Sequence, residues 1–168
     1  HAGFSEAAAQ PAARQKLATQ LANYCVGNGL AGVDFDWEFP ANNEFENYEE
    51  MMKEVRTEFD KTGLLLTSAI GQAHHDKFTA GTWQYLDFVN IMAYDMSWAS
   101  SGSTMSDNHS PANMHLEYYP IWENAGVPKE KIVMGMPFYA RQTNDWGIAK
   151  GYSEIFSSYS PLASDNLA

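Results

Sequence analysis

Residues 33–39 alternate strictly between apolar and acidic side chains, and this alternation constrains the fold more than any other feature of the sequence. Successive side chains of a β-strand point to opposite faces. One face of this strand therefore carries Asp34, Asp36 and Glu38, and the other carries Val33, Phe35, Trp37 and Phe39. The apolar face is too large for a solvated strand, so the acids are expected to face an enclosed polar space.

The row of acids predicts a carboxyl group that is still protonated near neutral pH. Alternate side chains start about 6.5–7 Å apart along a strand, and like charges this close cannot all stay ionised. A carboxyl with a raised pKa can act as a general acid. We expect Glu38 in this role, because active sites of parallel α/β folds open at the carboxyl ends of strands. Asp34 lies deepest and is expected to be structural, and Asp36 lies between the two.

Two other interpretations of the row are weaker. A lone acid in a strand is usually capped or solvated, but three on one face beside Trp37 are not explained in that way. A divalent metal site is also disfavoured, because a row along one strand does not wrap around an ion. We therefore expect no metal ligands.

The rest of the chain alternates between helix-like and strand-like segments. Helices are expected at residues 11–26, 44–61, 79–86 and 111–124, and strands at residues 32–39, 64–70, 88–94 and 132–139. A polar loop is expected at residues 95–110, and an irregular tail from Gln142 with a helical turn near residues 152–157. Apolar strands separated by helices indicate a parallel sheet covered on both faces. A doubly wound sheet and a (β/α) barrel both fit, although no Gly-rich nucleotide-binding loop follows any strand.

Composition limits the possible partners. The 168 residues are enough for one domain, and the net charge of −11 with no basic stripe argues against nucleic acid. No apolar run approaches the roughly 20 residues that span a bilayer, so no membrane partner is expected. Cys25 is the only cysteine and is expected to be a buried small hydrophobe. The chain shows no signal peptide, and its start at His1 suggests a piece of a longer protein.

The segment from Gly32 to Pro40 resembles the signature of the family-eighteen chitinases, D-x-x-D-x-D-x-E. Asp34, Asp36 and Glu38 match the last three acids. Ala31 stands at the first position of the signature. Because it is an odd number of residues from the three acids, it belongs to the apolar face of the strand, so this departure should affect packing more than chemistry. Asn90–Met96 is similar to the family's M-x-Y-D strand. Met134–Arg141 is similar to its G-x-P-F-Y-G-R strand, with Ala140 in place of Gly.

The resemblance covers nearly the whole chain and implies an α/β fold of the (β/α)8 TIM-barrel type. Such a barrel has eight strands and typically ~250 residues, so the chain is expected to hold about half of it, roughly the fourth to seventh strands. Residues 1–168 would form one partial glycoside hydrolase catalytic domain. Half a barrel exposes two apolar edges, which predicts pairing with the missing barrel half or with another copy.

The resemblance also implies a retaining, substrate-assisted mechanism, in which the N-acetyl group of the sugar is the nucleophile. Glu38 would be the proton donor and later the base. Asp36 would hold the acetamido N–H, Asp34 would tune Asp36, and Tyr94 would bind the acetamido oxygen. No cofactor or metal is implied.

Further residues are expected to bind substrate: Asp95, Met92, Trp98, Tyr139 and Arg141. Arg141 can equally pair with a surface acid. Trp146 is a further candidate for stacking on a sugar ring, whereas Trp122 is expected in the core. The segment His74-His75-Asp76 either lines the cleft or is only solvated.

The implied partners are chitin or N-acetylglucosamine oligosaccharides. An endo-β-N-acetylglucosaminidase acting on N-glycans would use the same strand chemistry, and a non-catalytic chitin-binding lectin-like relative is a third possibility. Such relatives commonly lose the acid, which is present here as Glu38. A structural α/β domain with buried acids would not explain why the acids, Tyr94 and Arg141 all fall near strand ends. The family is commonly exported, which predicts a secreted or periplasmic protein.

Overall fold

A computed structural model describes residues 2–96, 109–142 and 145–159. A parallel sheet in this part of the chain has the strand order β1-β2-β3-β4. The strands span Gly32–Asp36 (β1), Leu65–Gly71 (β2), Phe88–Met92 (β3) and Ile132–Met134 (β4). Strand order follows sequence order, whereas a doubly wound sheet reverses direction at a switch point. The topology is therefore that of a (β/α) barrel segment, as the sequence analysis predicted.

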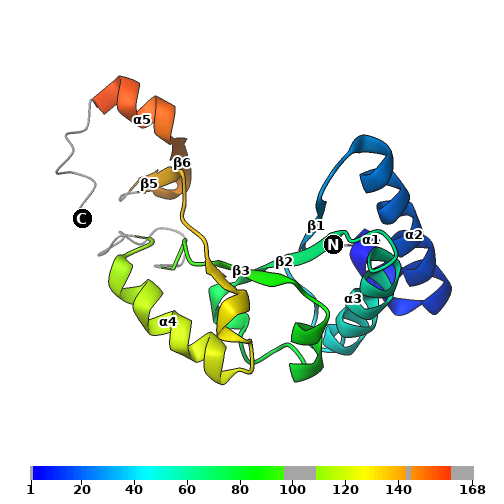
Figure 1. Cartoon of the computed structure of the whole chain (residues 1–168). Helices are drawn as coiled ribbons and strands as arrows, with labels where there is room; N and C mark the ends of the chain where they lie inside the picture. Colours follow the sequence, from blue (N-terminus) through cyan, green and yellow to red (C-terminus); the bar gives the residue numbers. More distant parts are fainter. Residues whose placement is uncertain (1, 97–108, 143–144, 160–168) are drawn as a thin grey trace.

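Helices connect the strands and cover the sheet (Figure 1). The α-helices span Ala2–Ala9 (α1), Pro11–Asn28 (α2), Phe45–Phe59 (α3), Ala112–Asn124 (α4) and Tyr152–Tyr159 (α5). Short 3-10 helices span Gln72–His74 (η1), Ala80–Gln84 (η2) and Lys129–Lys131 (η3). Figure 1 shows α1, α2 and α3 grouped at the β1 side of the sheet, while α4 lies at the other side.

The hydrophobic core lies against one face of the sheet. Strand residues on this face are buried: Phe35, Leu66, Ser68, Ile70, Val89 and Ile91. The α3 helix adds an apolar stripe at helical spacing to this core: Tyr48, Met51, Met52, Val55 and Phe59. Because side chains alternate along each strand, the opposite face of the sheet carries Asp34 and Asp36.

The start and end of α2 follow from local chemistry. Pro11 occupies the first turn, where its missing N–H costs nothing. Gly29 ends the helix with φ 64°, and its N–H faces the carbonyls of Cys25 and Val26. Cys25 itself is fully buried, as expected.

Two expectations about secondary structure are wrong, and one helix was missed. The expected strand at 132–139 ends at Met134. The Gly135 N–H still donates to the Ile91 carbonyl oxygen at 2.8 Å, but Pro137 has no N–H with which to continue the ladder. The tail expected to be irregular instead contains an antiparallel hairpin of Tyr139–Gln142 (β5) and Asp145–Gly151 (β6). The helical turn expected near residues 152–157 is confirmed as α5. The α1 helix was not predicted.

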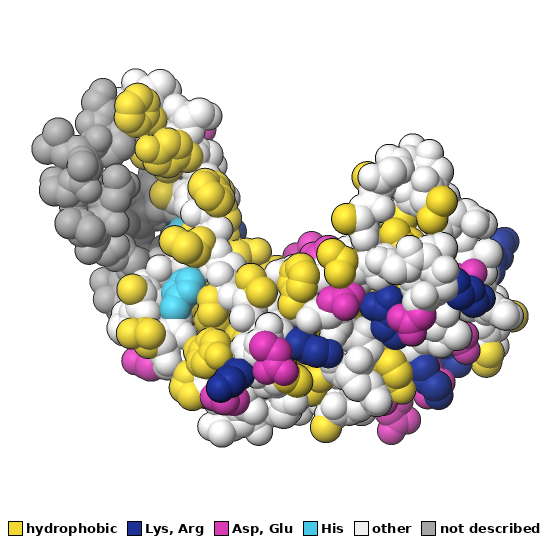
Figure 2. Space-filling model, viewed as in Figure 1, with side chains coloured by type: hydrophobic (Ala, Val, Ile, Leu, Met, Phe, Trp, Pro, Cys, Tyr) yellow, Lys and Arg dark blue, Asp and Glu magenta, His cyan; other side chains and the backbone are white. Residues whose placement is uncertain are grey.

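The hairpin and α5 project from the sheet as an arm (Figure 1). Figure 2 shows hydrophobic side chains along this arm, beside a broad hollow that separates it from the helices on the β1 side. Exposed examples are Phe138, Tyr152, Phe156 and Tyr159. Among the described residues, no helix is both long and apolar enough to cross a membrane.

The pairing of β1 with β2 leaves no room for a side chain at Gly32, so a substitution there should destabilise the fold. A Cβ on Gly32 would lie 2.0 Å from the Leu65 carbonyl oxygen, so Gly32→Ala should lower the free energy of unfolding by at least about 1–3 kcal/mol. The control is Gly27→Ala in α2, where a Cβ meets nothing within 4 Å and alanine favours the helix. Chemical denaturation of both variants measures the difference. Equal stabilities would contradict the close β1–β2 contact.

Candidate active site

The acidic face of β1 opens into the concave side of the sheet. Phe35 and Trp37 are each only 3% exposed on the opposite face. Their burial fixes the direction of the alternating acids, which all keep exposed side chains. The alternation that the sequence predicted is therefore present, although Trp37 and Glu38 lie beyond the last residue of the ladder, Asp36.

Neighbouring strands hold Asp34. Its Oδ1 accepts hydrogen bonds from the Thr67 hydroxyl of β2 and from Asn90 Nδ2 of β3, the latter at 2.9 Å. These two donors fix the position of the Asp34 carboxyl group. This arrangement agrees with a structural role for Asp34 beneath Asp36.

The environment of Glu38 raises the pKa of its carboxyl group. Partial burial is the largest cause, followed by the negative charges of Asp36 and Asp95 and by a hydrogen bond with Asp36. The crowding of like charges that the sequence predicted thus acts on Glu38. A carboxyl that keeps its proton to higher pH can donate it to a leaving group.

A cavity of about 230 Å³ brings Glu38 together with residues from β3 and from the segment after β2. Met92, Tyr94 and Asp95 line it from the end of β3. Burial and then the charges of Asp36 and Glu38 raise the pKa of Tyr94, so its hydroxyl remains a hydrogen-bond donor. The structure therefore gathers Glu38, Met92, Tyr94 and Asp95 around one space, as expected for a site at the carboxyl ends of parallel strands.

Asp95 is the centre of a hydrogen-bond network between β3 and β5. Its carboxylate accepts bonds from Tyr139 Oη at 2.8 Å and from Arg141 Nε and an Arg141 terminal nitrogen at 3.0 and 2.7 Å. Burial opposes ionisation, but the bonds from Arg141 and Tyr139 hold the pKa of Asp95 below its ordinary value. Arg141 thus pairs with a site residue, Asp95. The φ of Asp95, 55°, lies in the left-handed region that few non-glycine residues adopt.

The sequence analysis missed His109. Its Nδ1 lies 3.1 Å from Asp95 Oδ1, and its Nε2 lies 3.3 Å from the Tyr139 carbonyl oxygen, which fits an Nε2–H donor. His109 therefore connects the two ends of the Asp95 network. No strand or helix pattern marks it, since it lies in an irregular segment just before α4.

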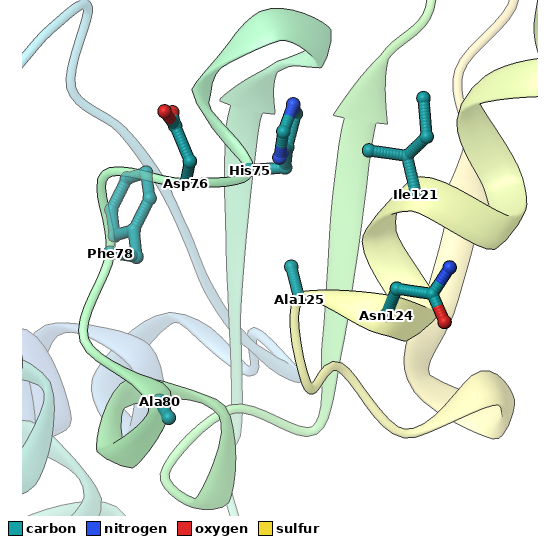
Figure 3. A pocket seen from close by; sticks show the side chains of 7 residues that line it. All are labelled: His75, Asp76, Phe78, Ala80, Ile121, Asn124 and Ala125. Carbon is teal, nitrogen blue, oxygen red and sulfur yellow. The ribbon is translucent and has the colours of Figure 1, made fainter.

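The residues of the segment after β2, His74, His75 and Asp76, line two different cavities. His74 lines the cavity that contains Glu38. His75 and Asp76 line a second, open cavity of about 450 Å³ with Phe78 and the end of α4. Figure 3 shows His75 and Asp76 on one side of this cavity, facing Ile121, Asn124 and Ala125 of α4 and its C-terminal end. The expectation that this segment lines the cleft thus applies to His74.

The three tryptophan candidates have different outcomes. Trp98 lies outside the described residues, and so does the side chain of Trp146. Trp122 is fully buried, as predicted. Within the described ranges, no group of three or more His, Cys, Asp or Glu side chains is placed to hold a metal ion.

A barrel-type sheet with a protonatable acid at the end of one strand and a tyrosine and an aspartate at the end of another defines a glycosidase-like site. Comparison with known proteins identifies the family: the model of the glycosyl hydrolases family 18 matches residues 1–162. The chain belongs to this family.

Individual relatives agree with this assignment. Probable chitinase 2 of Drosophila melanogaster is 33% identical over 157 residues, covering 83% of this chain and 32% of that protein. A family 18 N-acetylglucosaminidase structure from Paenibacillus barengoltzii has a TM-score of 0.75 and 26% identity, over 93% of this chain and 58% of that one. The Ostrinia furnacalis group IV chitinase in complex with allosamidin has a TM-score of 0.74 and 26% identity, over 98% of this chain and 58% of that one. The chain thus spans about a third of the first relative and more than half of each solved structure.

The Arg141–Asp95 pair predicts a pH-dependent contribution to stability. Both side chains are partly buried, at 18% and 24% exposure, so Arg141→Gln should cost about 1 kcal/mol at pH 7. Because the pKa of Asp95 is lowered, this contribution is present above the ordinary aspartate pKa of about 3.9 and is lost as pH falls through the lowered value.

Chemical denaturation of the parent and Arg141→Gln across pH measures this effect. Arg141→Lys is the control, because it keeps the charge without the two-pronged geometry. A stability difference that does not narrow at acidic pH would contradict the pairing.

Proposed function

We propose that this chain carries the proton-donor half of a chitinase-like glycosidase site, which cleaves β-1,4 bonds between N-acetylglucosamine units with retention. The single observation that carries the proposal is the raised pKa of Glu38 beside Asp36, in the cavity that Met92, Tyr94 and Asp95 also line. The family assignment and the chitinases among the relatives support it.

In the first step, the protonated Glu38 gives its proton to the glycosidic oxygen, and the bond from that oxygen to C1 breaks. The carbonyl oxygen of the sugar's own N-acetyl group forms a bond to C1, which gives a positively charged oxazolinium ring. Asp36 accepts a hydrogen bond from the acetamido N–H and stabilises this charge. Tyr94 donates to the acetamido oxygen and sets its angle of attack.

In the second step, the Glu38 carboxylate takes a proton from water as the water oxygen attacks C1. The bond from C1 to the acetamido oxygen breaks, which restores the N-acetyl group and the protonated acid. Asp34, held by Thr67 and Asn90, keeps Asp36 in place from below. Asp95, Tyr139 and Arg141 bind the distorted sugar, with Met92 packed on the inner face.

This mechanism needs no metal or cofactor, and its substrates are chitin and N-acetylglucosamine oligosaccharides. The relative crystallised with allosamidin is a chitinase, whereas another is an N-acetylglucosaminidase. Relatives of this chain therefore differ in their named activity, and the length of the sugar chain that is cleaved must be measured on the whole protein. Export to a secreted or periplasmic setting, as the resemblance implies, is part of the same proposal.

The proposal includes a partner surface on the chain. The edge strands of the described sheet are β1 and β4, and the exposed apolar side chains on the arm include Phe138 and Phe156. Edges and apolar surface of this kind favour contact with further polypeptide. Pairing with the other half of the barrel or with another copy would cover them.

The test is hydrolysis of a short N-acetylated chitooligosaccharide by the full protein that contains this chain, with Glu38→Gln beside the parent. Glutamine keeps the shape of the side chain but has no acidic proton, so kcat should fall by about 10²–10⁴. Chromatography of the released sugars measures the rate.

A deacetylated oligosaccharide of the same length is the matched substrate control. It lacks the acetamido nucleophile and should not be cleaved by the parent. Cleavage of both substrates at similar rates would contradict substrate assistance, and full activity of Glu38→Gln would contradict the acid assignment.

A further inference from the structure

The position of Glu38 is not set by the β-ladder. The last paired residue of β1 is Asp36, opposite Ala69 of β2, and the chain then leaves the sheet. Glu38 therefore depends on the side chains that flank it, Trp37 and Phe39. A general acid must be held in a fixed position close to the atom that it protonates. The contacts that fix Trp37 and Phe39 therefore affect catalysis.

Trp37 is anchored on the core side. Its ring stacks on the Phe4 ring of α1, with the ring centroids 5.4 Å apart and an angle of 13° between the ring planes. It also packs against the Tyr48 ring of α3, with the ring centroids 6.1 Å apart. This packing leaves it only 3% exposed. One side of Glu38 is thus fixed by the hydrophobic core.

Phe39 is anchored on the other side by His74. The two rings are stacked, with centroids 4.2 Å apart and planes at 23°. Both residues line the cavity that contains Glu38. Burial is the main cause that lowers the pKa of His74. Its ring is therefore uncharged at neutral pH and can stack on the Phe39 ring as a neutral aromatic group.

Gly71 completes this contact at the end of β2. A Cβ on Gly71 would lie 2.8 Å from His74 Nδ1 and 3.0 Å from two Phe39 ring atoms. Such distances are shorter than ordinary van der Waals contact, so only glycine leaves the rings where they are. The strand end, the phenylalanine and the histidine therefore form one packed unit, which we call the Gly71–Phe39–His74 stack.

We propose that His74 is a positioning residue for Glu38, acting through the Gly71–Phe39–His74 stack that holds the chain on the far side of the acid. The inference rests on the proposed function for its effect on rate, but its structural part is independent of activity. His74 also lines the cavity that contains Glu38.

Two replacements of His74 separate stacking from other roles. His74→Phe keeps an uncharged aromatic ring and should preserve the stack, whereas His74→Ala removes it and opens the cavity. His75→Ala is the matched control, because the adjacent imidazole lines the second cavity shown in Figure 3. Gly71→Ala is a fourth variant that leaves both rings chemically intact but must displace them.

The first measurement is the NMR titration of the Glu38 carboxyl carbon in the full protein, which requires no substrate. His74→Ala and Gly71→Ala should move the titration of Glu38 toward lower pH, since they loosen the packing that partly buries the carboxyl. His74→Phe and His75→Ala should titrate as the parent does. Unchanged titration in both His74→Ala and Gly71→Ala would overturn the inference.

The second measurement is steady-state hydrolysis of an N-acetylated chitooligosaccharide. His74→Ala should lower kcat by about 10-fold or more at a nearly unchanged KM, since misplacement of a catalytic group affects the transition state more than the ground state. His74→Phe should restore most of kcat. An inactive parent would contradict the proposed function, while the titration would still decide the positioning role. An active parent with equal kcat in all variants would overturn the inference alone.

Discussion

The burial of two aromatic residues on one face of β1 determines the rest of the site. Phe35 and Trp37 are each 3% exposed, and removing two such side chains from water stabilises the fold by several kcal/mol. Since strand side chains alternate, this burial forces Asp34, Asp36 and Glu38 onto the other face. The hydrophobic core thus supplies the free energy that holds three carboxyl groups close together.

The parallel register converts that row into a site. Pairing aligns Asp34 with Thr67 and Asp36 with Ala69, and β3 brings Asn90 beside them. The ends of the strands then present Tyr94 and Asp95 to the same cavity as Glu38. Asp95 has cationic and hydroxyl donors in Arg141 and Tyr139 and so stays ionised. Glu38 is partly buried and has carboxylates as charged neighbours, so its pKa is raised. The opposite pKa directions of two acids in one cavity give each a different chemical role.

Side-chain periodicity and local turn chemistry were enough to predict the elements that depend on them. Helix α2 begins at Pro11 and ends before Gly29, and the four parallel strands lie within or beside the expected ranges. The acidic face and the motif ends at Tyr94 and Arg141 were also found from the sequence alone.

The missed features depend on contacts between distant segments. Strand β4 ends beside Gly135, whose N–H bonds to the Ile91 carbonyl oxygen of β3, and no window of sequence contains that contact. The β5–β6 hairpin has little sequence signal, because β5 is only four residues long and β6 contains two glycines. His109 lies in an irregular segment just before α4, and it reaches the site only through its contacts with Asp95 after β3 and with Tyr139 of β5.

The most direct test of the central claim is the pH dependence of kcat/KM on an N-acetylated chitooligosaccharide, for the full protein and for Asp36→Asn. The alkaline limb of this profile reports the pKa of the essential acid in the free enzyme. Asparagine removes a negative charge beside Glu38, so the pKa of Glu38 should fall and the alkaline limb should move to lower pH in the residual activity of the variant. An alkaline limb that stays in place or moves to higher pH would contradict the assignment of Glu38 as the proton donor whose ionisation Asp36 controls.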